Sequence, residues 1–211
     1  MSESKIDPII GDKINERIVW IDCEMTGLSL VEDALVEIAV IVTDSELNPI
    51  GPGLEIVIKP PAQALSQMSD FVRDMHINSG LLPLLESGTN LADAETNVLD
   101  YLKNCGVDVG KSPICGNSIW VDRNFIARDL PKVSEYLHYR SVDVSSIKEL
   151  ARRWYPRVYF NAPKKIGNHR ALGDIQDSLI ELRYYQAAIF AAQPGPESEA
   201  LRLISDGLTT P

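Results

Sequence analysis

Two carboxylates near the start of the chain, Asp22 and Glu24, follow the apolar run IVWI. Side chains alternate between two faces along a β-strand, so we expect these two to point the same way while Cys23 points back. Two anions held side by side repel each other unless a cation lies between them. A hard divalent ion such as Mg²⁺ prefers oxygen ligands. The spacing therefore predicts a metal site at the end of the first strand.

Three further residues could complete this pair. Asp122 comes just after an expected strand, Asp174 opens the last expected helix, and His169 lies on the loop that leads into it. Strand ends and helix starts meet at the carboxyl edge of an α/β sheet. Four acids and one histidine there suit a two-metal phosphodiesterase, in which one ion activates water and the other stabilises the leaving oxygen. An imidazole changes charge near neutral pH and could accept the proton of that water.

Each of these residues also has a simpler interpretation. Asp is favoured at helix starts by capping and by the helix dipole, which would account for Asp122 and Asp174. His169 has basic neighbours at 164, 165 and 170 and could be one more surface base. A single acid at a strand end is usually solvated. These interpretations explain poorly why all five residues fall at the ends of elements in one arrangement.

The remaining sequence predicts a single α/β domain that could position these groups. Strands are expected at residues 18–23, 35–43, 54–58, 113–116 and 139–142, the first three as an antiparallel meander. Short helices are expected within 66–85, with Ser69 or Asp70 as an N-cap, and longer ones at 91–104, 121–129, 145–154 and 173–192. We expect a flexible leader at 1–16, the domain at 17–192 and a mobile tail at 193–211.

The composition limits the partners of this 211-residue chain, whose net charge is −10. Proteins that wrap long duplexes by counterion release are usually basic. A short anionic ligand remains possible, because residues 140–170 carry eight basic and two acidic side chains. The three cysteines lack zinc-like spacing, and no apolar stretch is long enough to span a membrane. We expect a reducing, cytoplasmic setting and no membrane partner.

Four sequence blocks resemble the exonuclease motifs of the DEDD superfamily, in its histidine-containing branch. They read IDCEMTGL, ICGNSIWVDRNF, HYRSVDVS and NHRALGDI, and the likeness covers about residues 17–190. The order Asp-x-Glu, mid-chain Asp and His-x4-Asp is the specific part. MTGL and HYRSVDVS narrow the likeness to the oligoribonuclease family, which degrades very short RNA from its 3′ end. The resemblance implies a ribonuclease H-like fold, with a mixed five-stranded sheet flanked by helices.

The resemblance also implies a role for each member of the catalytic set. Asp22, Glu24 and Asp174 would ligate two Mg²⁺ or Mn²⁺ ions directly, with Asp22 bridging them. Asp122, the fourth metal residue, would act through a water molecule. His169 would be the general base. Oxygen ligands suit these ions better than zinc.

A narrow pocket for a dinucleotide is implied as well. Leu28 matches a residue that wedges against the bases, and His76 and Ser118 match groups near the nucleotide backbone. Where the family often has Trp, this chain has Phe71, whose ring offers a smaller stacking face and no indole donor. Phe71 could instead be a core residue.

The family's cap on the 5′ phosphate matches three residues here. Arg140 would form charge-assisted hydrogen bonds to the phosphate, and Ser145 would add a short neutral one. Tyr139 would come from the partner subunit of a homodimer. Because a longer chain cannot pass the cap, it would restrict the substrate to short single-stranded RNA.

Two other functions are compatible with parts of this pattern. One is a broader DEDD exonuclease of the tRNA-trimming or proofreading type, which the acidic charge and the cap block disfavour. The other is a catalytically silent nucleic-acid-binding module, which normally lacks at least one carboxylate or the histidine. We therefore expect a metal-dependent 3′→5′ exoribonuclease that converts dinucleotides and other very short RNAs to 5′-mononucleotides.

Overall fold

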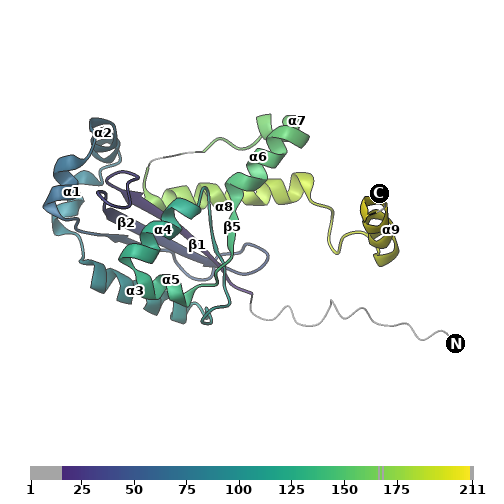
Figure 1. The fold of residues 1–211 in the computed structure, drawn as a ribbon, viewed down its shortest axis with the longest axis horizontal. Coiled ribbons are helices and arrows are strands. Elements are labelled where there is room, and N and C mark those ends of the chain that lie inside the picture. The colour runs from purple at the N-terminus through teal and green to yellow at the C-terminus, as the bar shows by residue number, and fades with distance from the viewer. Residues whose placement is uncertain (1–15, 166, 168, 210–211) are drawn as a thin grey trace.

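The computed structural model describes residues 16–165, 167 and 169–209, so the predicted leader lies almost entirely outside the described residues. Five strands form one mixed sheet in the order β3-β2-β1-β4-β5 (Figure 1). The first three strands pair antiparallel, whereas β4 runs parallel to β1 and to β5. The predicted mixed sheet with its antiparallel meander is thus confirmed. The strands are β1 (Ile18–Met25), β2 (Leu35–Thr43), β3 (Leu54–Val57), β4 (Ile114–Gly116) and β5 (Ser141–Asp143).

Helices connect the strands and cover the sheet. Ser69, one of the two predicted caps, accepts a hydrogen bond from the Val72 amide at the start of α2. Two short helices, α5 and α7, were not predicted, although each begins at a proline, the residue favoured at the first helical position. The helices are α1 (Ala62–Gln67), α2 (Asp70–Asn78), the 3₁₀ helix η2 (Leu82–Ser87), α3 (Leu91–Asn104), α4 (Trp120–Asp129), α5 (Pro131–Tyr136), α6 (Val144–Trp154), α7 (Pro156–Phe160), α8 (Ala171–Ile189) and α9 (Ser198–Thr209).

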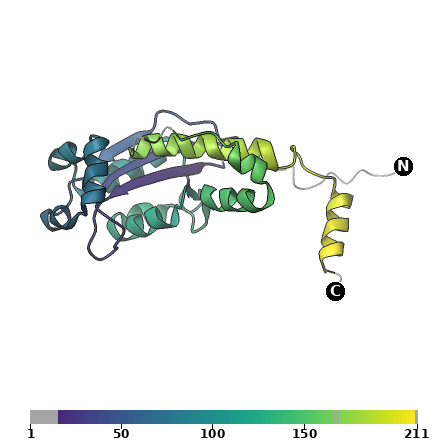
Figure 2. The same cartoon turned by 90° about the horizontal axis from the view of Figure 1, so that it is seen from above.

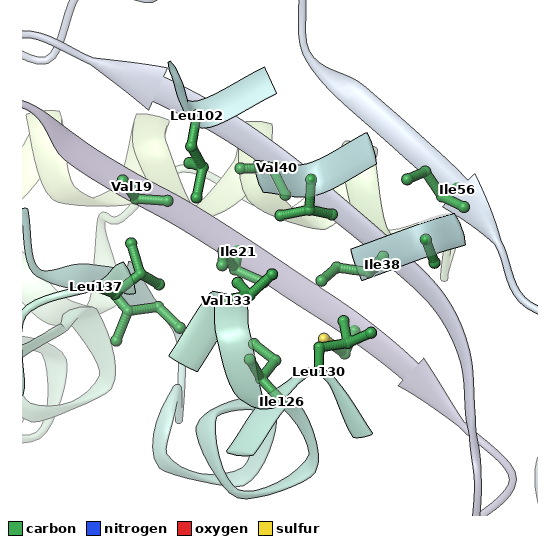
Figure 3. Close-up of a cluster of buried hydrophobic side chains, with 14 of the residues drawn as sticks. Val19, Ile21, Ile38, Val40, Ile56, Leu102, Ile126, Leu130, Val133 and Leu137 are labelled. Carbon is green, nitrogen blue, oxygen red and sulfur yellow. The ribbon is translucent and has the colours of Figure 1, made fainter. Parts of the chain in front are cut away.

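The central strand β1 separates two layers of helices, which Figure 2 shows on opposite sides of the sheet. Its residues Val19, Ile21 and Cys23 belong to a buried cluster with residues of α3, α4 and α5 (Figure 3). Trp20 faces the other way and joins a second cluster with residues of α6 and α8. Because side chains alternate along a strand, the residues at 22 and 24 follow Trp20 onto the face that α8 covers.

The segment 193–211, predicted as a mobile tail, contains a helix. None of the residues of α9 is buried, and the helix lies away from the body of the molecule (Figures 1 and 2). In the described part of the chain, no helix is long and apolar enough to cross a membrane.

Candidate active site

Three carboxylates converge where the start of α8 packs on β1. One oxygen from each of Asp22, Glu24 and Asp174 lies within 4.8 Å of the others. The strand supplies two of them from one face, and Asp174 comes from the first turn of the helix packed on that face. The N-cap residue of this helix is Arg170, whose side chain makes no capping hydrogen bond, so Asp174 is not an N-cap residue. Of the five residues predicted to converge, the structure thus brings these three together in one cluster.

Burial and neighbouring negative charges raise the pKa values of all three carboxylates. Burial, followed by the charges of Asp122 and Asp174, raises the pKa of Asp22 well above its ordinary value. Burial and the Asp174 carboxylate raise the pKa of Glu24 to about 8. The pKa of Asp174 is also raised, mainly by burial, against the opposing positive charges of His169 and Lys165. A buried, oxygen-only cluster of this kind fits a hard divalent cation, which would remove the repulsion.

The fourth acid, Asp122, lies beside this cluster rather than within it. Its side-chain oxygen accepts a hydrogen bond from the Cys23 amide at 2.9 Å, which ties the first turn of α4 to the middle of β1. Capping of its own helix does not account for that long-range contact. Burial raises the pKa of Asp122 to about 7, although the hydrogen bond from Cys23 acts in the opposite direction. That Asp122 acts on the metal through a water molecule stays a prediction.

His169 lies on the exposed loop just before α8, with its backbone in the left-handed region at φ 51°. Its side chain is not part of the carboxylate cluster, although it is near enough to lower the pKa of Asp174. Exposure leaves the ring accessible to water. The histidine therefore occupies the loop position that the sequence predicted for it.

One residue that matters for this geometry, Glu37 on β2, received no role from the sequence. It is fully buried and lies opposite Glu24 in the strand register. Its two oxygens accept hydrogen bonds from the Arg170 Nε at 2.9 Å and from the Ala171 amide at 3.0 Å. These bonds fasten the start of α8 to the sheet, between the histidine and Asp174. A signal existed, because a lone acid inside the run LVEIAVIVT must find a partner when it is buried.

The residues predicted to contact bases lie on the surface. Leu28 is 75% exposed and Phe71 is 80% exposed, so the interpretation of Phe71 as a core residue is wrong. The loop that carries Leu28 is braced by Asp33, which accepts hydrogen bonds from the Thr26 hydroxyl and the Ser29 amide. His76 is fully buried, and its Nε2 lies 2.9 Å from the backbone oxygen at the end of β1.

The predicted phosphate-binding residues form two groups. Ser118 and Ser145 meet, because the Ser118 amide donates to the Ser145 hydroxyl oxygen at 3.0 Å. Tyr139 is 74% exposed and stacks against His138, and the Arg140 guanidinium lies 5.7 Å from its ring centre. Within the described residues, no hydrogen bond joins the Tyr139 or Arg140 side chain to the serine pair.

Solved structures with similar folds are exonucleases. Exonuclease I from Methylocaldum szegediense aligns with 83% of this chain at a TM-score of 0.59 and 19% identity. E. coli exonuclease I in complex with a dT13 oligonucleotide aligns with 92% at a TM-score of 0.62 and 18% identity. The chain spans only 41% and 44% of those proteins, and at this identity the likeness shows the fold alone.

Similarity in sequence is much closer. The family model described as Exonuclease matches residues 19–182. The oligoribonuclease of Streptomyces griseus is 60% identical over 94% of this chain and 98% of its own length. That of Leifsonia xyli subsp. xyli is 56% identical over 90% and 92%. With its acidic cluster, fold and near full-length similarity, the chain belongs to the exonuclease family and, within it, to the oligoribonucleases.

Proposed function

We propose that this chain is a 3′→5′ exoribonuclease that hydrolyses very short oligoribonucleotides, dinucleotides above all, to 5′-mononucleotides. The observation that carries the proposal is the convergence of Asp22, Glu24 and Asp174 where the start of α8 packs on β1. It occurs in a chain that matches proteins named oligoribonuclease over nearly its whole length.

Two divalent ions, Mg²⁺ or Mn²⁺, fit the donor set that these carboxylates provide. Asp22, Glu24 and Asp174 would hold them, and Asp122 would act from its place beside the cluster. When bound, such ions supply positive charge that favours ionised water and offsets the charge that develops on the phosphate. The two elements that carry these carboxylates, β1 and α8, pack against each other in the core.

The proton of the attacking water goes to His169 in this proposal. The water oxygen then bonds to phosphorus, and the bond from phosphorus to the 3′ oxygen of the preceding nucleotide breaks. The leaving 3′ oxygen takes a proton from solvent, and the terminal nucleotide departs as a 5′-monophosphate. The exposed loop position of His169 supports this role, since the ring can exchange its proton with water between turnovers.

The substrate would lie between exposed apolar residues and the phosphate cap, which we define as Tyr139, Arg140 and Ser145. Leu28 and Phe71 offer exposed side chains to the bases. Three free and buried cysteines in the described residues support a reducing compartment, and we place the protein in the cytoplasm.

The first test is a time course on 5′-labelled RNA, using a dinucleotide and a strand of about 20 nucleotides, each with and without Mn²⁺. We expect fast, metal-dependent conversion of the dinucleotide and slow cleavage of the long strand. Asp22→Ala is the matched control and should abolish turnover. An intact dinucleotide would refute the proposal, and equal rates would instead indicate a general trimming exonuclease.

We further propose a homodimer in which Tyr139 completes the partner's site. Its exposure, away from the serine pair of its own chain, supports this arrangement. A mixture of Asp22→Ala and Tyr139→Ala subunits should then regain up to about a quarter of wild-type dinucleotide hydrolysis, because half of the dimers carry one intact site. Asp22→Ala mixed with His169→Ala should regain none, since both changes fall in one chain's half of the site. Equal behaviour of the two mixtures would show that Tyr139 acts within its own chain.

A further inference from the structure

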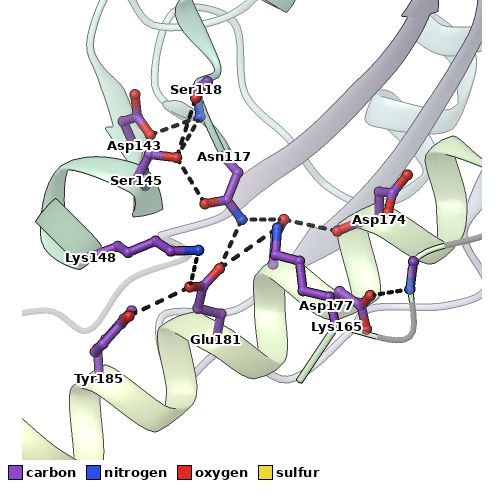
Figure 4. Close-up of polar contacts among 12 residues, drawn as sticks. Asn117, Ser118, Asp143, Ser145, Lys148, Lys165, Asp174, Asp177, Glu181 and Tyr185 are labelled. Atoms are coloured by element: carbon purple, nitrogen blue, oxygen red, sulfur yellow. Dashed lines mark hydrogen bonds and ion pairs between the residues drawn. The ribbon is translucent and has the colours of Figure 1, made fainter. Parts of the chain in front are cut away.

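Asn117, directly after β4, forms three side-chain hydrogen bonds (Figure 4). Its oxygen accepts from the Ser145 hydroxyl at 2.9 Å. Its nitrogen donates to the Ser178 hydroxyl oxygen at 2.7 Å and to the Glu181 carboxylate at 3.2 Å. The amide orientation is fixed, because only the NH₂ group can face a carboxylate.

One side of this residue holds the phosphate-binding serines. Ser145, which bonds to Asn117, also accepts from the Ser118 amide. Asp143 accepts from the same amide at 3.0 Å and from the Ser145 amide at 2.8 Å. The two serines are therefore fixed relative to each other and to the end of β4.

On its other side, Asn117 is connected through Ser178 to the backbone of Asp174. The Ser178 hydroxyl donates to the backbone oxygen of Asp174 at 2.8 Å, one turn earlier in α8. Glu181, only 5% exposed, also accepts from Lys148 at 3.0 Å and lies 3.7 Å from the ammonium of Lys165. Figure 4 shows a continuous chain of polar contacts from Ser118 to Asp174, with Asn117 at its centre. Asn117 joins Ser145 to α8 directly, beside the Lys148–Glu181 ion pair that joins α6 to the same helix.

We propose that Asn117 is a specificity-determining positioning residue that fixes Ser145 of the phosphate cap relative to α8, the helix that carries Asp174. The inference rests on the proposed function and deepens it. A 5′-phosphorylated dinucleotide carries its 5′ phosphate one nucleotide away from its single scissile phosphate. A rigid link between the groups that contact these two phosphates favours this substrate, because less reorganisation is needed on binding. A dinucleotide without the 5′ phosphate gains nothing from the link.

The test compares kcat and KM for an RNA dinucleotide with a 5′ phosphate and the same dinucleotide with a 5′ hydroxyl, in Mn²⁺. For Asn117→Ala we expect the preference in kcat/KM for the phosphorylated form to fall about 10–100-fold. The rate on the 5′-hydroxyl form should change by less than about threefold. Asn97→Ala, at an exposed asparagine of α3 outside the site, is the matched control and should keep the wild-type preference.

A second pair of variants, in which one charge is added and another is removed, tests the inference even if the alanine variant folds poorly. Asn117→Asp places a second carboxylate against Glu181, so it should lose the preference as well. Adding Glu181→Gln to that variant removes the repulsion and should restore part of the preference, which a general loss of structure would not do. Equal losses on both dinucleotides, or an unchanged preference, would overturn the inference while the proposed hydrolysis stands. A wild-type protein that cleaves neither dinucleotide would instead refute the proposed function.

Discussion

At the scale of single residues, Glu24 and Asp122 show a conflict between folding and ionisation. Both are nearly buried, and burial is the main cause that raises their pKa values, to about 8 and about 7. In an unfolded chain such groups titrate near pH 4. The folded protein therefore retains protons between pH 4 and 8 that the unfolded chain has already released.

This conflict predicts how stability depends on pH when a chelator removes divalent ions. The carboxyls favour the folded state fully below about pH 4, and this contribution is lost as the pH rises through about 7–8. The melting temperature of the metal-free protein should therefore fall between pH 5 and 8, by about 2–4 °C for each kcal/mol lost. Calorimetry of wild type and Glu24→Gln checks this, because the variant should show a flatter dependence. A wild-type melting temperature that stays constant or rises over this range would contradict it.

At the scale of elements, the start of α8 is held by one buried ion pair. Glu37 on β2 is fully buried, and Arg170 reaches it at 2.7 Å while also pairing with the more exposed Glu55 at 3.0 Å. The first pair lies where solvent does not screen it, whereas the second lies near the surface. Removal of the arginine would leave the Glu37 charge buried without its cation.

We therefore expect Arg170→Ala to lower the free energy of unfolding by about 3 kcal/mol. Glu55→Gln, which removes the outer pair and leaves the buried one, should cost less than about 1 kcal/mol. Urea denaturation of both variants measures the difference. Similar losses for the two would show that the arginine does not act through Glu37.

Sequence periodicity predicted the elements that are built from local patterns. The alternation in β1 brought Asp22 and Glu24 to one face, and the β-branched run of β2 marked a buried strand. The partnership of Asn117 with α8 was beyond such reasoning, because it joins residues more than 60 positions apart. The helix α9 was not predicted, although its apolar residues recur at helical spacing. The Pro-Gly-Pro sequence before it favoured the prediction of a mobile tail.

At the scale of the whole molecule, the sheet and its two helical layers form the unit that positions the site, and α9 lies outside it (Figure 2). A chain ending at Ala192 should therefore keep its dinucleotide activity, with a melting temperature within about 2 °C of the full chain. Tyr185→Ala, which empties a fully buried position in α8, shows the sensitivity of the measurement and should cost about 3–5 kcal/mol. Loss of activity on truncation would contradict this prediction and show that residues 193–211 contribute to activity.

Because side chains alternate along β1, the thiol of Cys23 can be used to probe the opening of that strand. Cys23 lies between Asp22 and Glu24 in sequence but on the opposite face of the strand, 7% exposed, as a free thiol. Burial, helped by the charge of Asp122, raises the pKa of this thiol well above its ordinary value. Thiol reagents attack the thiolate, so they reach this sulfur only when the strand separates from its neighbours. The rate at which Cys23 is labelled therefore reports the opening free energy of the very strand that carries Asp22 and Glu24.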